Sequence, residues 1–251
     1  MTDQTNSPPR IAAFRPDDGR AAAAGELLTR LGADPVIDPM VRLAPTGALP
    51  SATGDFVVLT SPAAAEILAE AEWRSEDVTV CAIGSRTAAA LRETGITVDI
   101  VPAEYTSSGL VETLSGLVDG QHVEVARSDH GSPVLLEGLR EAGATVTETI
   151  LYELRRPEGA GESAMLLAEG DLDAVLFTSA LTVEHFLKSA DEREIGADVR
   201  EQLATVVVGA IGAPTRRAAE KRDIAVDVVP ETVSFERLAE AVIEQLINNE
   251  R

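Results

Sequence analysis

The chain has 251 residues, 45% of them hydrophobic, which is enough to bury one large core or two ordinary ones, and the length favours two domains. Acidic residues outnumber basic residues by 42 to 21, and the resulting formal charge of −21 argues against a nucleic-acid partner, because phosphates would be repelled. The polar first ten residues predict no signal peptide and no stretch predicts a membrane span, so we expect a cytoplasmic monomer that binds no membrane.

The chain opens with a predicted strand, helix and strand. Residues 11–14 form a short apolar run, residues 21–32 carry leucines at helical spacing and end on a glycine, and residues 35–41 return as an extended run. The same unit recurs at residues 123–154, where the glycine that ends the helix lies 143 − 32 = 111 residues further on.

A second motif is also present twice. The segment DFVVLTSP at residues 55–62 returns as DAVLFTSA at residues 173–180, an offset of 178 − 60 = 118. Each copy predicts a buried strand that leads into a helix. We expect Ser61 to cap the first of these helices, with Pro62 at its first position, so that backbone amides form an anion site at the strand end.

A third pair of segments completes the repeat. Residues 82–104 match residues 210–231 at an offset of 210 − 82 = 128. The offset is larger because the second copy has about ten more residues in the polar connection before this segment, which we interpret as a loop insertion.

Three matched pairs in the same order indicate one α/β pattern that is present twice, in copies of about 110 to 120 residues. Alternating strands and helices predict parallel sheets with helices on both faces, and two such sheets make two domains. The predicted joints are rich in proline and glycine, at residues 43–54 and 155–163. The pattern leaves open whether the halves fold separately or exchange their first strand–helix–strand units.

Hydroxyl side chains follow the predicted strands, at the edge where open α/β sheets bind ligands. Each hydroxyl either satisfies backbone groups at a helix start or turn, or contacts a ligand. The candidate substrate-binding hydroxyls are Thr60, Ser61, Thr87, Thr178, Ser179 and Thr215.

Three larger polar side chains are further candidates. Arg15 and Arg127 each follow the first strand of their copy, and they are either solvated or supply the positive charge that an anionic ligand of this acidic protein would need. Tyr152 matches Val41 of the first copy, so only one copy carries a phenol there. It is either a half-buried packing residue or a catalytic group.

The sequence predicts neither a metal nor a cofactor. The three histidines have no spacing that would gather a metal, and the single cysteine forms no Cys/His cluster. No G-x-G-x-x-G follows a strand, which argues against a dinucleotide enzyme.

Four motifs together resemble the uroporphyrinogen-III synthase family, over Ile11 to Ile247. They are the strand that ends in TSP, I-G-x-x-T-A followed by G-I-x-V-D-I-V-P, Y-T-x-x-G-L, and the tyrosine of L-Y-E-L. The resemblance implies two flavodoxin-like domains joined by a two-stranded linker. Residues 1–39 with 158–251 would form one domain, and residues 40–157, including both linker segments, the other.

The resemblance also implies a reaction. Members of this family convert the linear tetrapyrrole hydroxymethylbilane to uroporphyrinogen III, losing water and inverting the terminal pyrrole ring, without a cofactor. Tyr152 occupies the context in which a tyrosine is suggested to help the hydroxyl depart. The alternative is a non-catalytic tetrapyrrole-binding module or small-molecule sensor of the same fold.

The charge balance leads to a first testable prediction. Acidic residues are spread along the whole chain and only Lys188 and Lys221 are lysines, which suggests a halophilic protein. Because the Debye length falls to about 3 Å at 1 M salt, molar salt screens the self-repulsion. We expect the melting temperature and activity to rise with molar salt, and an equal melting temperature in dilute and molar salt would contradict this.

Overall fold

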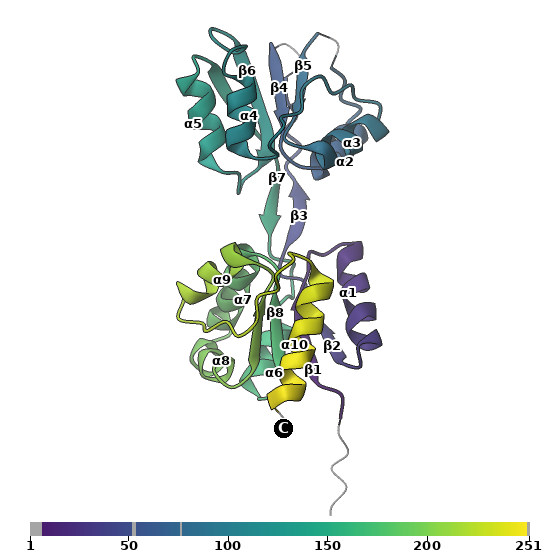
Figure 1. Ribbon diagram of the computed structural model, residues 1–251, viewed down its shortest axis with the longest axis vertical. Helices are drawn as coiled ribbons and strands as arrows, with labels where there is room; N and C mark the ends of the chain where they lie inside the picture. The colour runs from purple at the N-terminus through teal and green to yellow at the C-terminus, as the bar shows by residue number, and fades with distance from the viewer. Residues whose placement is uncertain (1–6, 52–53, 76, 250–251) are drawn as a thin grey trace, which may run out of the picture. The chain divides into compact units, whose positions relative to one another are not determined.

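The computed structural model describes residues 7–51, 54–75 and 77–249, so most of the polar leader predicted for residues 1–10 and part of the first predicted joint lie outside the described residues. The chain divides into two compact units (Figure 1). Unit 1 comprises Met1–Leu43 with Arg155–Arg251, and unit 2 comprises Ala44–Leu154. The chain therefore passes between the units twice, within β3 (Arg42–Pro45) and at the end of β7 (Thr145–Arg155).

Unit 1 contains a parallel sheet in the order β2-β1-β8-β9. A single parallel bridge from Gly209 to Val228 extends its β9 edge. Its elements are β1 (Arg10–Phe14), α1 (Gly19–Arg30), β2 (Asp34–Ile37), α6 (Glu162–Ala168), β8 (Ala174–Phe177), α7 (Ala180–Glu192), α8 (Gly196–Leu203), β9 (Val207–Ala210), α9 (Ala213–Glu220) and α10 (Phe235–Asn249).

Unit 2 contains a sheet in the order β3-β7-β6-β4-β5, which the parallel bridge from Cys81 to Ile100 extends beyond β5. The pairs among β4 to β7 are parallel. Besides β3 and β7, its elements are β4 (Phe56–Leu59), α2 (Ala63–Glu70), β5 (Thr79–Ala82), α3 (Ser85–Glu93), α4 (Ser107–Leu114), β6 (His122–Ser128) and α5 (Pro133–Glu141).

Strand pairing answers the question that the repeat left open. In unit 1, β1 of the first copy pairs with β8 of the second, with Ile11 opposite Ala174. In unit 2, β6 of the second copy pairs with β4 of the first, with Val123 opposite Phe56. Each strand–helix–strand unit therefore completes the sheet of the other copy. The predicted α/β fold with parallel sheets is confirmed.

Helices cover both faces of the unit 1 sheet. On one face, Phe14, Phe177 and Phe186 form a cluster with ring centroids 4.9 to 5.6 Å apart, under α6, α7 and α8. On the other face, Leu28 of α1 and Leu238 of α10 pack against alternate residues of the same strands. This alternation within short apolar strands is the reason that both faces of the sheet are buried.

The residues interpreted as a loop insertion are helical, and that prediction is wrong. Residues 188–192 end α7 and residues 196–197 begin α8, with a short turn at residues 193–195 between them. Val199 and Leu203 of α8 are buried in the unit 1 core. The apolar residues that make α8 amphipathic lie just beyond the polar insertion, which hides its helical character in the sequence.

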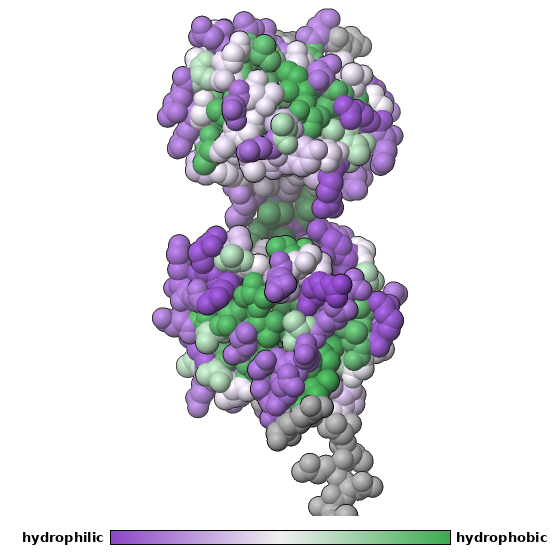
Figure 2. All heavy atoms as spheres, viewed as in Figure 1, coloured by the Kyte–Doolittle hydropathy of each residue, from purple (hydrophilic) through white to green (hydrophobic). Residues whose placement is uncertain are grey.

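Hydrophilic side chains cover much of the visible face of each unit, with smaller apolar areas between them (Figure 2). This agrees with an acidic chain whose apolar residues are mostly used in the two cores. Within the described part of the chain, every helix is too short or too polar to span a bilayer.

Candidate active site

The carboxyl edge of the unit 2 sheet gathers most of the predicted site residues of that unit. The strands β4, β5 and β6 are parallel, so Thr60, Gly84 and Ser128 lie at the same edge where these strands end. Strand β7 continues past this edge and places Tyr152 opposite Ser128. The edge therefore carries hydroxyl groups and helix starts, and Thr60 and Ser61 are half-buried there.

Tyr152 and Ser61 are joined directly. The Tyr152 hydroxyl donates a hydrogen bond to Ser61 Oγ at 2.8 Å, although 91 residues separate them. Tyr152 is only 6% exposed, whereas Ser61 is half-buried. The phenol is thus held at the inner side of the pair, and the serine lies closer to solvent.

The prediction that Ser61 caps α2 is wrong. The helix begins at Ala63, and Pro62 occupies the position before it without a side-chain cap. The Ala64 amide, which a capping serine side chain could bind, donates to the Ser61 carbonyl at 3.2 Å. The Ser61 hydroxyl accepts from Tyr152 instead.

The matching hydroxyls of unit 1 do serve the backbone. Ser179 caps α7, with its side chain accepting from the amide of Thr182 at 3.1 Å in a reciprocal capping box. Thr178 donates to the carbonyl of Phe14, which ties the ends of β8 and β1 together. The sequence left open whether these two hydroxyls satisfy backbone groups or contact a ligand, and in the structure both satisfy backbone groups.

Thr87 and Thr215 occupy equivalent buried places in the first turns of α3 and α9. The cap residues of these helices are Gly84 and Gly212, and neither helix start has a side-chain cap hydrogen bond. Burial of the threonines favours a packing role for them. The uncapped amides nearby remain the groups that could receive an anion.

The two predicted arginines have different environments. Arg127 is buried, and its Nε lies 2.6 Å from Glu148 while its guanidinium also donates to the carbonyl of Ser132. The charge of Arg127 is therefore paired with that of Glu148 within unit 2. Sequence reasoning missed Glu148 because the ion pair depends on the register of β6 and β7, which places Glu148 opposite Val125 and Ile150 opposite Arg127.

The guanidinium of Arg15 is less occupied by protein partners than that of Arg127. Its guanidinium lies 5.1 Å from the ring centroid of Phe235, and its Nε is buried without a hydrogen-bond partner among the described residues. Burial and the neighbouring Arg20 lower the pKa of Arg15, while Asp18 raises it. An arginine remains charged under these conditions. Phe235 gave no signal in the sequence, because its place under Arg15 depends on the packing of α10.

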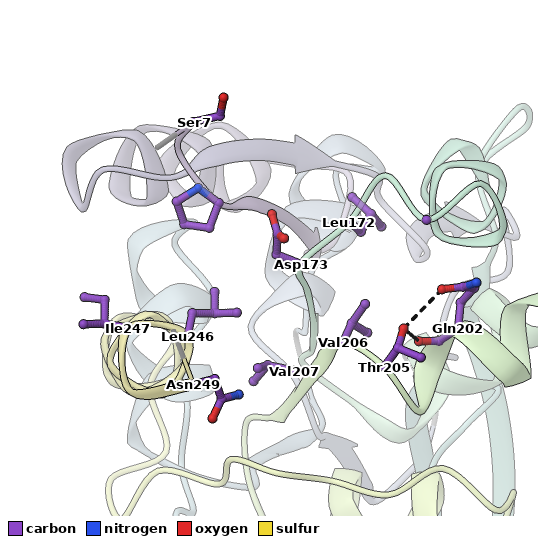
Figure 3. A pocket seen from close by; sticks show the side chains of 12 residues that line it. Ser7, Leu172, Asp173, Gln202, Thr205, Val206, Val207, Leu246, Ile247 and Asn249 are labelled. Atoms are coloured by element: carbon purple, nitrogen blue, oxygen red, sulfur yellow. Dashed lines mark hydrogen bonds between the residues drawn. The ribbon is translucent and has the colours of Figure 1, made fainter. Parts of the chain in front are cut away.

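A surface cavity lies away from these residues. Figure 3 shows this cavity at the amino ends of β8 and β9, where Asp173 and Val207 line it together with Leu246 of α10. None of the predicted site residues lines it. The Asp173 carboxylate accepts from the Arg10 amide at 2.6 Å, which gives it a structural partner. The carboxyl edges of the two sheets therefore remain the candidate sites, one in each unit.

Comparisons with known proteins agree on one family. The family model described as "Uroporphyrinogen-III synthase HemD" matches residues 22–240. A protein of Methanothermobacter thermautotrophicus, provisionally named a uroporphyrinogen-III synthase, is 36% identical over 248 residues, covering 92% of this chain and 96% of its own length. The uroporphyrinogen-III synthase of Chlorobaculum parvum is 29% identical over 170 residues, or 66% of each chain.

Solved structures show the same fold. A mutant uroporphyrinogen III synthase of Thermus thermophilus matches with a TM-score of 0.66 at 23% identity, covering 96% of this chain and 99% of the other. The uroporphyrinogen-III synthetase of Helicobacter pylori matches with a TM-score of 0.63 at 15% identity, covering 94% and 99%. With the family model covering most of its length, the chain belongs to the uroporphyrinogen-III synthase family.

Proposed function

We propose that the protein cyclises hydroxymethylbilane to uroporphyrinogen III, with Tyr152 supplying a proton to the departing hydroxyl and Arg15 binding a substrate carboxylate. The hydroxyls and uncapped helix starts at the carboxyl edges would hold the bilane in the conformation that inverts the terminal ring. Such positioning accounts for much of the catalytic task, because the bilane also closes without the enzyme, to the uninverted isomer.

The observation that carries these roles is the buried phenol at a sheet edge where hydroxyls and the amides of helix starts gather. Tyr152 is held by a hydrogen bond to Ser61 where the parallel strands end. A phenol stays protonated at neutral pH and can act as a general acid. Its equivalent in unit 1 is Val41, so only unit 2 can supply this proton from that position.

The test is to supply hydroxymethylbilane at several salt concentrations and to identify the uroporphyrinogen isomer that forms. We expect uroporphyrinogen III to form faster than the spontaneous ring closure. Formation of the uninverted isomer alone, at the spontaneous rate, would reject the proposal and favour a binding module.

A matched pair of variants tests the division of roles between the arginines. We expect Arg15→Met to raise KM about tenfold or more, because a hydrogen bond to a charged group contributes roughly 1.5 to 3 kcal/mol. Arg127→Met should mainly lower the melting temperature, since it leaves Glu148 without its partner. Steady-state kinetics and thermal unfolding of both variants check this. The reverse pattern would assign substrate binding to Arg127.

A further inference from the structure

We infer that Ser61 is the catalytic residue that passes the proton of Tyr152 to the departing hydroxyl group. This inference rests on the proposed function and adds a residue to it. Tyr152 would then act through Ser61 and would not itself touch the leaving oxygen. Three features of unit 2 support the assignment: the deeper burial of Tyr152 than of Ser61, the absence of a side-chain cap at the start of α2, and the anchoring of Tyr152.

The burial of the two residues places the serine outermost. The phenol oxygen and Ser61 Oγ lie 2.8 Å apart. Tyr152 is almost fully buried and Ser61 is half-buried, so the serine is the more accessible residue of the pair. A serine hydroxyl can accept one hydrogen bond and donate another, which a relay requires.

The two copies of the repeat differ at each residue that this arrangement needs. Ser179, the equivalent of Ser61, is occupied as the cap of α7 and bonds to Thr182. In α2 the residue equivalent to Thr182 is Ala64, at the same offset of 182 − 64 = 118, and it cannot complete a capping box. The position equivalent to Tyr152 is Val41. The first copy thus frees a serine hydroxyl, and the second supplies the phenol that bonds to it.

One residue, Asp129, fixes the backbone at Tyr152 and directly after it. The Asp129 amide donates to the Tyr152 carbonyl at 3.3 Å, and the Asp129 carboxylate accepts from the amide of Leu154 at 3.0 Å. These contacts follow the bulge that ends β6. They hold the tyrosine against Ser61 without help from a ligand, so the hydroxyl pair is preorganised.

The proton balance of the step is complete. The bond between carbon and the terminal hydroxyl breaks, and its electron pair leaves with the oxygen. That oxygen takes the Ser61 proton and departs as water, while Ser61 takes the Tyr152 proton. The proton that the pyrrole carbon releases when the ring closes returns to the phenolate, so that hydroxymethylbilane yields uroporphyrinogen III and water.

A double-mutant cycle tests the relay. We expect Ser61→Ala to lower kcat about tenfold with little change in KM, and Ser61→Thr to restore most of the rate. In the Tyr152→Phe background, Ser61→Ala should lower kcat less than about threefold further, because both groups serve one proton path. Additive effects, or an effect on KM alone, would make Ser61 an independent substrate contact and overturn the inference.

A matched control separates chemistry from folding. Ser132 of the same unit caps α5 by accepting from the Val134 amide at 3.3 Å. Ser132→Ala should cost about 1 kcal/mol of stability and leave kcat unchanged. An equal loss of kcat in Ser132→Ala and Ser61→Ala would show that both losses come from destabilisation.

A spectroscopic test does not depend on turnover. Tyr105 and Tyr152 are the two tyrosines of the chain, so in the Tyr105→Phe variant the Raman tyrosine doublet reports Tyr152 alone. Its intensity ratio should be that of a hydrogen-bond donor and should change when Ser61→Ala is added. An unchanged ratio would overturn the hydrogen bond itself. If this test succeeds and Tyr152→Phe keeps full activity, the proposed role of the tyrosine fails instead.

Discussion

Tyr152→Phe is expected to lower kcat about tenfold to a hundredfold, which lies at or below the lower limit of the roughly 10² to 10⁴-fold typical of general acid catalysis. The bilane ionises readily by electron donation from its own pyrrole, so proton donation to the leaving group accounts for a modest share of the rate. Phenylalanine keeps the ring that packs in unit 2 and removes only the hydroxyl that bonds to Ser61. The fold and the affinity for product should therefore be nearly unchanged.

Stopped-time assays of uroporphyrinogen III formation, together with circular dichroism of the variant, measure both parts of this prediction. A folded Tyr152→Phe variant that makes the inverted isomer at the wild-type rate would return Tyr152 to a packing role. Catalysis would then have to rest on conformational control by the hydroxyls and amides of the two carboxyl edges.

Asp38→Ala, in unit 1, is expected to cost about 3 to 5 kcal/mol of stability, because each buried group left unsatisfied costs roughly 1 to 3 kcal/mol. The buried Asp38 carboxylate accepts from the amides of Gly161 and Ser163 and from the Ser163 hydroxyl, at 2.5 to 3.1 Å. Gly161 is the cap residue of α6 and has no side chain, so Asp38 supplies the missing cap from 123 residues away. Its removal leaves buried N–H groups without a partner.

Thermal unfolding measures this effect. For a chain of this size the loss corresponds to a fall of roughly 10 °C or more in the melting temperature. Asp34→Ala is the matched control, because the exposed Asp34 makes only a surface ion pair with Arg10 at 3.5 Å. It should cost less than about 1 kcal/mol. Equal melting temperatures for the two variants would show that the hydrogen bonds from the start of α6 to Asp38 contribute nothing to stability.

Capping at the helix starts shows where prediction from local sequence succeeds and where it fails. Ser179 is followed three residues later by Thr182, and the capping box between them is local, so the sequence signal holds. The Ser61 prediction fails because the Ala64 amide bonds to the Ser61 carbonyl, Ala64 has no side chain that could complete a capping box, and Tyr152 provides a distant partner. A hydroxyl can form its hydrogen bond with a local backbone group or with a group that is distant in sequence, and the sequence pattern shows only the local groups.

The sequence by itself determined the α/β class, the parallel sheets and the order of the repeated elements, because hydrophobic periodicity and turn residues act over short distances along the chain. The family followed from the resemblance of four short motifs. Only the tertiary structure decided which copy completes which sheet. It also decided that Arg127 pairs with Glu148 while Arg15 stacks on Phe235, and that the Tyr152 hydroxyl forms a hydrogen bond with Ser61. Those contacts join residues that are distant in sequence. They are fixed by strand register and by the need to satisfy buried polar groups, neither of which leaves a local pattern.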